Sequence, residues 1–131
     1  MKQSENKPGR SILIVEDEAD LVNVLSDILT QAGYQVTTTG NGDEGLRVAI
    51  EKHPDLILLD ILMPKKDGIE MLKELRQAQK PPISSVIFFT NLSQMEKIQS
   101  AIKEGAAGYI IKAESSLEDI VKKVDEFFRN K

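Results

Sequence analysis

Several short apolar runs in this sequence are followed directly by acidic, hydroxyl or amino side chains. The polar groups at these positions are Glu16-Asp17-Glu18, Asp60, Thr90 and Lys112. Asp60 interrupts the apolar stretch LILLDILMP, where an unpaired carboxylate would be costly to bury. Each group taken singly has an ordinary structural explanation, such as the first turn of a helix or a solvated surface. Their joint occurrence at equivalent positions indicates a site.

The charges of this set suggest its chemistry. Two carboxylates about 4 Å apart repel by roughly 1 kcal/mol in water and about 4 kcal/mol at an effective dielectric of about 20. A cluster of Glu16, Asp17 and Asp60 would therefore either hold protons or recruit a cation. An all-oxygen set without histidine or cysteine suits Mg²⁺ or Mn²⁺, and such an ion in turn binds phosphoryl oxygens.

The remaining side chains fit the transfer of a phosphoryl group. Lys112 supplies a point charge, and Thr90 a hydroxyl, for phosphoryl oxygens that the metal does not hold. A carboxylate such as Asp60 can be the nucleophile and form an aspartyl phosphate. This reaction depends mainly on positioning and charge stabilisation, which the set provides.

Two patterns of apolar residues alternate along the chain, short continuous runs and helical spacing. They identify the strands and helices that must position these groups. Short apolar runs indicate strands, and almost wholly apolar ones indicate strands covered on both faces. The predicted strands are Ile12–Val15, Val36–Thr39, Leu56–Leu59, Val86–Phe89 and Tyr109–Ile111. A helical segment follows each strand, and each has its own apolar face.

The helical segments carry recognisable start signals. Asp67 is placed to cap the third, and the spacing Ser93-x-x-Glu96 is typical of a capping box at the start of the fourth. The last helix is expected to begin at Ser115 or Ser116. The predicted apolar faces of the first and second helices are Leu21, Leu25, Ile28, Leu29 and Ala32, then Leu46, Ala49 and Ile50.

Strict alternation of strands and helices predicts an α/β fold with a parallel sheet and right-handed crossovers. Open sheets of this kind bind ligands beyond the carboxyl ends of their strands. We therefore expect the acidic residues, Thr90 and Lys112 to converge at one edge of the sheet.

Composition limits the remaining possibilities. The chain has 131 residues, of which 40% are hydrophobic and 29% are charged, and this suits a single domain. The domain is predicted for residues 11–131, after a flexible arm formed by residues 1–10. The net charge of −4 argues against a nucleic-acid binder that relies on phosphate attraction. No apolar run is long enough to span a membrane, and there is no cysteine. A cytoplasmic location is expected.

Four motifs occur in a fixed order along the chain: ILIVEDE, DLILLDILMPKKDG, VIFFT and GAAGYIIK. Together they resemble the receiver domain of two-component response regulators of the chemotaxis type, from about Ser11 to about Phe128. The resemblance implies a flavodoxin-like, doubly wound three-layer sandwich with the strand order 2-1-3-4-5. It also implies a phosphorelay signalling domain and no enzyme beyond its own phosphorylation and dephosphorylation.

The resemblance implies a role for each acidic residue of the site. Asp60 resembles the phosphoacceptor, and Asp17 resembles a direct Mg²⁺ ligand. Glu16 resembles a residue that binds the metal through water. The backbone carbonyl of Leu62, two residues after the phosphoacceptor, resembles a further metal ligand.

Other residues resemble the parts of a switch. Thr90 resembles the hydroxyl that swings toward the phosphoryl group, Tyr109 the aromatic ring that moves inward with it, and Lys112 the lysine that pairs with the phosphoryl group. The surface expected to change is the fourth helix, fifth strand and fifth helix, roughly Ser93 to Phe128. A sensor histidine kinase or histidine phosphotransfer protein is the implied donor, and an unidentified protein is the output partner. The domain is expected to be a monomer or a phosphorylation-dependent dimer, without direct contact to nucleic acid or membrane.

The sequence departs from the family pattern at a few positions. Ala113 replaces the usual proline after the lysine, Asn91 replaces a small residue, and Glu16 replaces the more frequent aspartate. Leu62 and Leu92 flank the expected path of the hydrolytic water and are apolar. We therefore expect slow loss of the phosphoryl group.

Three alternatives remain open from the sequence. A receiver-like module that no longer cycles phosphate would bind neither Mg²⁺ nor beryllofluoride. A haloacid-dehalogenase-type phosphatase usually has a second aspartate two residues after the nucleophile, where Leu62 stands here. A flavodoxin-type binder of flavin mononucleotide would need a hydroxyl- and glycine-rich loop in place of Glu16-Asp17-Glu18.

Overall fold

The computed structural model describes residues 10–81 and 83–130, apart from the side chain of Leu92. The predicted arm, residues 1–10, lies outside the described residues except for Arg10. Within the described part, the sheet has five parallel strands in the order β2-β1-β3-β4-β5, which confirms the predicted topology. The strands are β1 (Ser11–Val15), β2 (Gln35–Thr39), β3 (Leu56–Leu59), β4 (Ser85–Thr90) and β5 (Gly108–Ile111).

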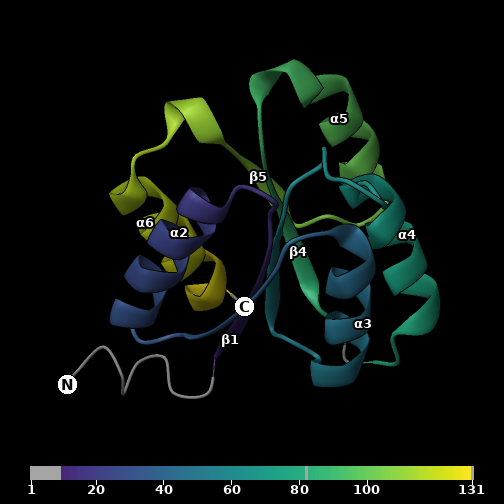
Figure 1. Cartoon of the computed structure of the whole chain (residues 1–131), viewed down its shortest axis with the longest axis horizontal. Coiled ribbons are helices and arrows are strands. Elements are labelled where there is room, and N and C mark those ends of the chain that lie inside the picture. Colours follow the sequence, from purple (N-terminus) through teal and green to yellow (C-terminus); the bar gives the residue numbers. More distant parts are fainter. Residues whose placement is uncertain (1–9, 82, 131) are drawn as a thin grey trace.

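Helices cover both faces of the sheet and form the predicted three layers (Figure 1). One face is covered by α2 (Ala19–Gln31) and α6 (Leu117–Arg129). The other is covered by α3 (Gly42–Lys52), α4 (Gly68–Ala78) and α5 (Met95–Lys103). The strands β1 and β3 are almost wholly buried because both of their faces pack against helices.

Two hydrophobic cores, one on each face, hold the layers together. Alternate residues of one strand serve both cores, so that Ile14 and Leu58 face α2 and α6 while Leu13 and Ile57 face the other three helices. The central strands therefore read as continuous apolar runs, which is why they could be located from sequence.

Helix ends follow local chemistry in most places. Asp67 caps α4 by accepting a hydrogen bond from the backbone of Glu70 at 2.8 Å. The last helix begins after Ser116, whose side chain forms a reciprocal capping box with Asp119. Gly33 ends α2 with a φ of +105°, a conformation that favours glycine.

The predicted capping box at Ser93 is wrong. Residues Leu92–Gln94 form a 3-10 turn (η1), and α5 begins only at Met95 without a side-chain cap. The backbone N–H of Gln94 donates to the carbonyl of Asn91 at 3.0 Å. Because Ser93 already lies inside this turn, it cannot adopt the extended backbone that a capping residue needs.

The apolar face predicted for α3 is wrong at one position. Ile50 is 36% exposed, whereas Val48 and Ala49 are buried. Gly45 lies against Val15 of β1, and the helix packs on α4, so the buried face is rotated away from Ile50. No helix in the described part of the chain is long and apolar enough to cross a membrane.

Candidate functional site

The structure brings the predicted polar groups to the edge where the parallel strands end, at the top of Figure 1. Glu16 follows β1, Asp60 follows β3, Thr90 ends β4 and Lys112 follows β5. The backbone of Asp60 donates to the carbonyl of Val15 at 3.1 Å, which extends the pairing of β3 with β1 by one residue. The sheet itself therefore fixes the backbone beneath Asp60.

Three carboxylates form a cluster at this edge. Glu16, Asp17 and Asp60 each offer an oxygen within 4.8 Å of the others. Glu16 and Asp60 are only 2% and 5% exposed, whereas Asp17 is open to solvent. An all-oxygen set with one open side fits a hard divalent cation that keeps several waters, such as Mg²⁺ or Mn²⁺.

The Lys112 ammonium joins two of these carboxylates. Its Nζ lies 2.7 Å from Glu16 Oε1 and 3.0 Å from Asp60 Oδ2, with Glu18 Oε1 at 3.5 Å. The Lys112 side chain is only 12% exposed, so its pairs with the buried Glu16 and Asp60 are largely shielded from water, whereas Glu18 is exposed. The ammonium therefore balances the negative charge of the cluster.

The same contacts change the proton affinities of the pair. Burial raises the pKa of Glu16 and the nearby charge of Asp60 adds to this, although the bond from Lys112 opposes both. Burial alone would lower the pKa of Lys112, but its bonds to Glu16 and Asp60 outweigh burial and raise the pKa. Lys112 is thus held in its charged form.

Thr90 lies at the end of β4 between Asp60 and Lys112 in the order of the sheet. It is 1% exposed, and its hydroxyl has no hydrogen-bond partner among the described residues. A buried hydroxyl without a partner costs stability, and the Thr90 hydroxyl is therefore available to donate a hydrogen bond to a ligand oxygen.

Replacing Thr90 by valine is expected to raise the free energy of unfolding of the metal-free protein by about 1 kcal/mol. The isosteric change removes a buried hydroxyl that no described residue satisfies. Urea unfolding followed by circular dichroism measures the effect, with Thr38→Val at an exposed position of β2 as the control. A clear loss of stability in Thr90→Val would show that the hydroxyl is hydrogen-bonded in solution.

The loop after Asp60 shapes one side of the site. The Leu62 side chain is 49% exposed, and no hydrogen bond from a described residue occupies its backbone carbonyl. Gly68 donates its backbone N–H to the carbonyl of Ile61 at 2.8 Å. A Cβ at Gly68 would lie 2.2 Å from the carbonyl oxygen of Asp60, so only glycine fits here.

Two further residues that the sequence singled out lie in β5 and in the turn directly after it. Tyr109 is 36% exposed, and the Lys123 ammonium lies 5.8 Å from the centre of its ring. The ring is therefore at the surface in this structure. Ala113 lies in a 3-10 turn (η2, Lys112–Glu114) that follows β5 directly.

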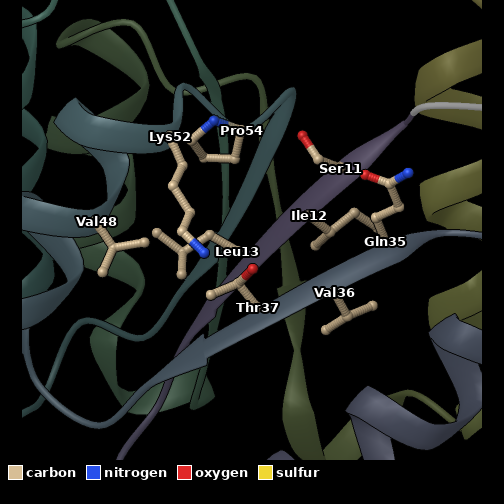
Figure 2. Close-up of a pocket in the computed structure, with 9 residues that line it drawn as sticks. All are labelled: Ser11, Ile12, Leu13, Gln35, Val36, Thr37, Val48, Lys52 and Pro54. Atoms are coloured by element: carbon tan, nitrogen blue, oxygen red, sulfur yellow. The ribbon is translucent and has the colours of Figure 1, made fainter.

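Cavities occur near both ends of the parallel strands. One of about 310 Å³ adjoins the acidic cluster and is lined by Glu16, Asp17 and Thr39. Another, of about 280 Å³, lies near the opposite ends of β1 and β2, where Figure 2 shows Lys52 extending toward Leu13 and Thr37. That second cavity contains none of the predicted site residues.

The structure adds one residue that the sequence did not single out. Lys66 in the β3–α4 loop contacts Glu74 and Asp43, which lie on two different helices. No local pattern indicates such contacts, because the partners are 8 and 23 positions away in the sequence.

The fold and the site together define a class: a doubly wound α/β domain with a lysine-paired acidic pocket at the carboxyl edge of its sheet. Within this class, the chain belongs to the response regulator receiver domain family, whose family model matches residues 12–125. This confirms the resemblance of the four motifs and favours two-component signalling over the phosphatase and flavin-binding alternatives.

Individual relatives agree with the family. The chemotaxis protein CheY of Thermotoga maritima is 36% identical over 105 residues, which cover 79% of this chain and 86% of that protein. The alkaline phosphatase synthesis transcriptional regulatory protein PhoP of Bacillus subtilis is 38% identical over 110 residues, 84% of this chain and 45% of that protein. This chain spans about half the length of the transcriptional regulators that it matches.

Solved structures show the same fold. A CheY-like receiver domain protein of Methanospirillum hungatei has a TM-score of 0.84 and 27% identity, covering 92% of this chain and 94% of that one. The chemotaxis protein CheY4 of Vibrio cholerae has a TM-score of 0.80 and 28% identity, covering 88% and 96%. The chain is therefore a signalling domain of the receiver type.

Proposed function

We propose that Asp60 accepts a phosphoryl group from a phosphohistidine on a sensor histidine kinase or a histidine phosphotransfer protein. The observation that carries this proposal is the convergence of Asp60 with two other carboxylates and Lys112 at one edge of the sheet. Family membership supports a phosphorelay role, and the geometry supports Asp60 as the nucleophile.

The transfer follows from the position of the Asp60 carboxylate. One of its oxygens attacks the phosphorus atom, the bond between phosphorus and the imidazole nitrogen breaks, and that nitrogen keeps the electron pair. Lys112 already lies 3.0 Å from Asp60 Oδ2, so its ammonium can pass to a phosphoryl oxygen with a small movement. The Thr90 hydroxyl can donate to another.

The acidic cluster is the proposed metal site. Asp17, Asp60 and the Leu62 carbonyl would hold Mg²⁺ or Mn²⁺ directly, and Glu16 would do so through water. When bound, the ion neutralises charge on the phosphoryl oxygens.

The acyl phosphate is then hydrolysed: water attacks the phosphorus atom, and the Asp60 carboxylate is the leaving group. The side chain of Leu62 is apolar and exposed beside the site, so it offers the water no hydrogen bond. The Leu92 side chain lies outside the described residues. We propose that the phosphorylated form is consequently long-lived, and that the domain catalyses only its own phosphorylation and dephosphorylation.

The proposed output surface consists of α5, β5 and α6. Three large apolar side chains are exposed there: Ile102, Tyr109 and Leu117. Phosphorylation would draw Thr90 toward the phosphoryl group and Tyr109 inward behind it, which shifts an equilibrium between two arrangements of this surface. A protein is the proposed partner, with the domain as a monomer or a phosphorylation-dependent dimer.

Incubation with acetyl phosphate and Mg²⁺, followed by intact mass spectrometry, tests the proposal. The wild type should gain one phosphoryl group and Asp60→Asn none. Asp27→Asn, at an exposed position of α2, removes the same charge elsewhere and should behave like the wild type. A wild type that takes up neither the phosphoryl group nor beryllofluoride would instead be a receiver module held in one state.

A further inference from the structure

The loop that carries Leu62 is attached to two helices through Lys66. The Lys66 ammonium lies 2.6 Å from Glu74 Oε2 on α4 and 3.6 Å from Asp43 Oδ1 on α3. The Lys66 side chain is 15% exposed, and it meets carboxylates of Glu74 and Asp43 that are themselves 39% and 57% exposed. One side chain therefore joins the loop, α3 and α4.

The backbone of the loop is strained beside this lysine. Lys65 has a φ of +72°, a region that residues other than glycine rarely adopt. The backbone N–H of Lys66 donates to the carbonyl of Pro64 at 2.8 Å, which closes a three-residue turn around Lys65. Such a turn persists only where surrounding contacts hold it in place.

Two close backbone approaches complete these constraints. A Cβ at Gly42 would lie 2.2 Å from the carbonyl oxygen of Lys66, so the loop presses against the start of α3. The other end of the loop is fixed where Gly68 meets the carbonyl of Asp60. Between these two points, Leu62 and Met63 make no hydrogen bond with any described residue that would fix the backbone.

We propose that Lys66 is a positioning residue for the metal site. Its contacts with Glu74 and Asp43 hold the strained turn, and the turn in turn holds the Leu62 carbonyl toward the acidic cluster. This inference rests on the proposed function, because it assigns Lys66 a role toward a metal bound at Asp17, Asp60 and Leu62.

The direction in which Mg²⁺ affinity changes when Lys66 loses its charge distinguishes a positioning role from a purely electrostatic one. Removing any cation near the site reduces the repulsion of Mg²⁺ and should tighten its binding slightly. Losing the support of a metal ligand weakens binding instead. Weaker Mg²⁺ binding after loss of the Lys66 charge is therefore opposite to the electrostatic effect. It indicates that the Leu62 carbonyl is no longer held in position.

The neighbouring Lys65 provides a matched control. It lies in the same loop, is exposed, and forms no ion pair with a residue that the structure describes. Lys65→Met and Lys66→Met therefore remove the same charge from adjacent positions, and methionine keeps the length of the side chain in both.

Calorimetric titration with Mg²⁺ measures the first effect. We expect Lys66→Met to weaken Mg²⁺ affinity by about tenfold, the lower end of the effect of losing a residue that positions a metal ligand. Lys65→Met should bind as tightly as the wild type or slightly more tightly. Equal affinities of Lys66→Met and wild type, or equal weakening in both variants, would overturn the inference.

Amide hydrogen exchange in the metal-free protein measures the second effect. The backbone N–H groups at positions 66 and 68 should exchange faster in Lys66→Met than in Lys65→Met. Each of these N–H groups donates a hydrogen bond within the loop, and the loop should open more often without the contacts of Lys66. The inference requires both effects, and either one without the other would overturn it. If the wild type bound no Mg²⁺, the proposed metal site would be refuted. If the wild type and Lys66→Met both bound Mg²⁺ equally tightly, only the role of Lys66 would be refuted.

Discussion

Replacing Lys112 by methionine is expected to lower the free energy of unfolding of the metal-free protein by about 3–5 kcal/mol. The ammonium lies within 3.0 Å of both Glu16 and Asp60, and those side chains are only 1% and 7% exposed. Without Lys112, two buried carboxylates would face each other with no opposing charge. Removal of one partner from a buried ion pair costs far more than removal of a surface charge.

Urea unfolding in EDTA measures this loss, with Lys97→Met at an exposed position of α5 as the control. The same titration in Mg²⁺ gives a second expectation. At one fixed Mg²⁺ concentration the variant should gain more stability than the wild type, because its carboxylates lack the competing ammonium. If Lys112→Met were as stable in EDTA as Lys97→Met, the carboxylates would be hydrated and the pairing with Lys112 would not stabilise the fold.

Replacing Gly68 by alanine is expected to cost about 3 kcal/mol of unfolding free energy, at the upper end for overpacking. The added methyl group would lie 2.2 Å from the carbonyl oxygen of Asp60 and 3.1 Å from the Cα of Ile61. Both neighbours belong to the backbone, so no side-chain rotation can relieve the clash. The loop must move, and it carries Asp60 and Leu62 with it.

The control for Gly68→Ala is Gly108→Ala in β5, where a Cβ meets nothing within 4 Å. Its stability should stay within about 0.5 kcal/mol of the wild type. Folded Gly68→Ala should also take up the phosphoryl group from acetyl phosphate much more slowly, which mass spectrometry at low temperature would show. Wild-type stability and uptake in this variant would mean that the approach of Gly68 to Asp60 is looser than the structure indicates.

Much of the fold could be predicted because its signals are local. The central strands are buried on both faces, so each appears as a continuous apolar run such as Leu56–Leu59. Asp67 and Ser116 cap their helices through hydrogen bonds to residues three positions away. Such contacts depend on near neighbours in the sequence, and a pattern of residue types is enough to predict them.

The errors arose where a neighbouring element overrode a local signal. Ser93 and Glu96 have the spacing of a capping box, but the chain leaving β4 turns first through Leu92–Gln94. Ile50 has helical spacing with Leu46, but α3 is rotated so that Val48 faces the core instead. In both cases the packing of neighbouring elements, and not the local residue pattern, determined where the helix begins or which face is buried.

The alternation of strands and helices was enough to predict which side chains gather at the carboxyl edge, because parallel strands must place the residues that follow them on one side. Glu16, Asp60, Thr90 and Lys112 were identified in this way. Their contacts could not be predicted. The folded domain shows that Lys112 bridges two buried carboxylates, that Thr90 has no partner in the described chain, and that Lys66 joins the loop to two helices. These contacts depend on distances of a few ångström between separate elements, and such distances are set by the packing of the whole domain.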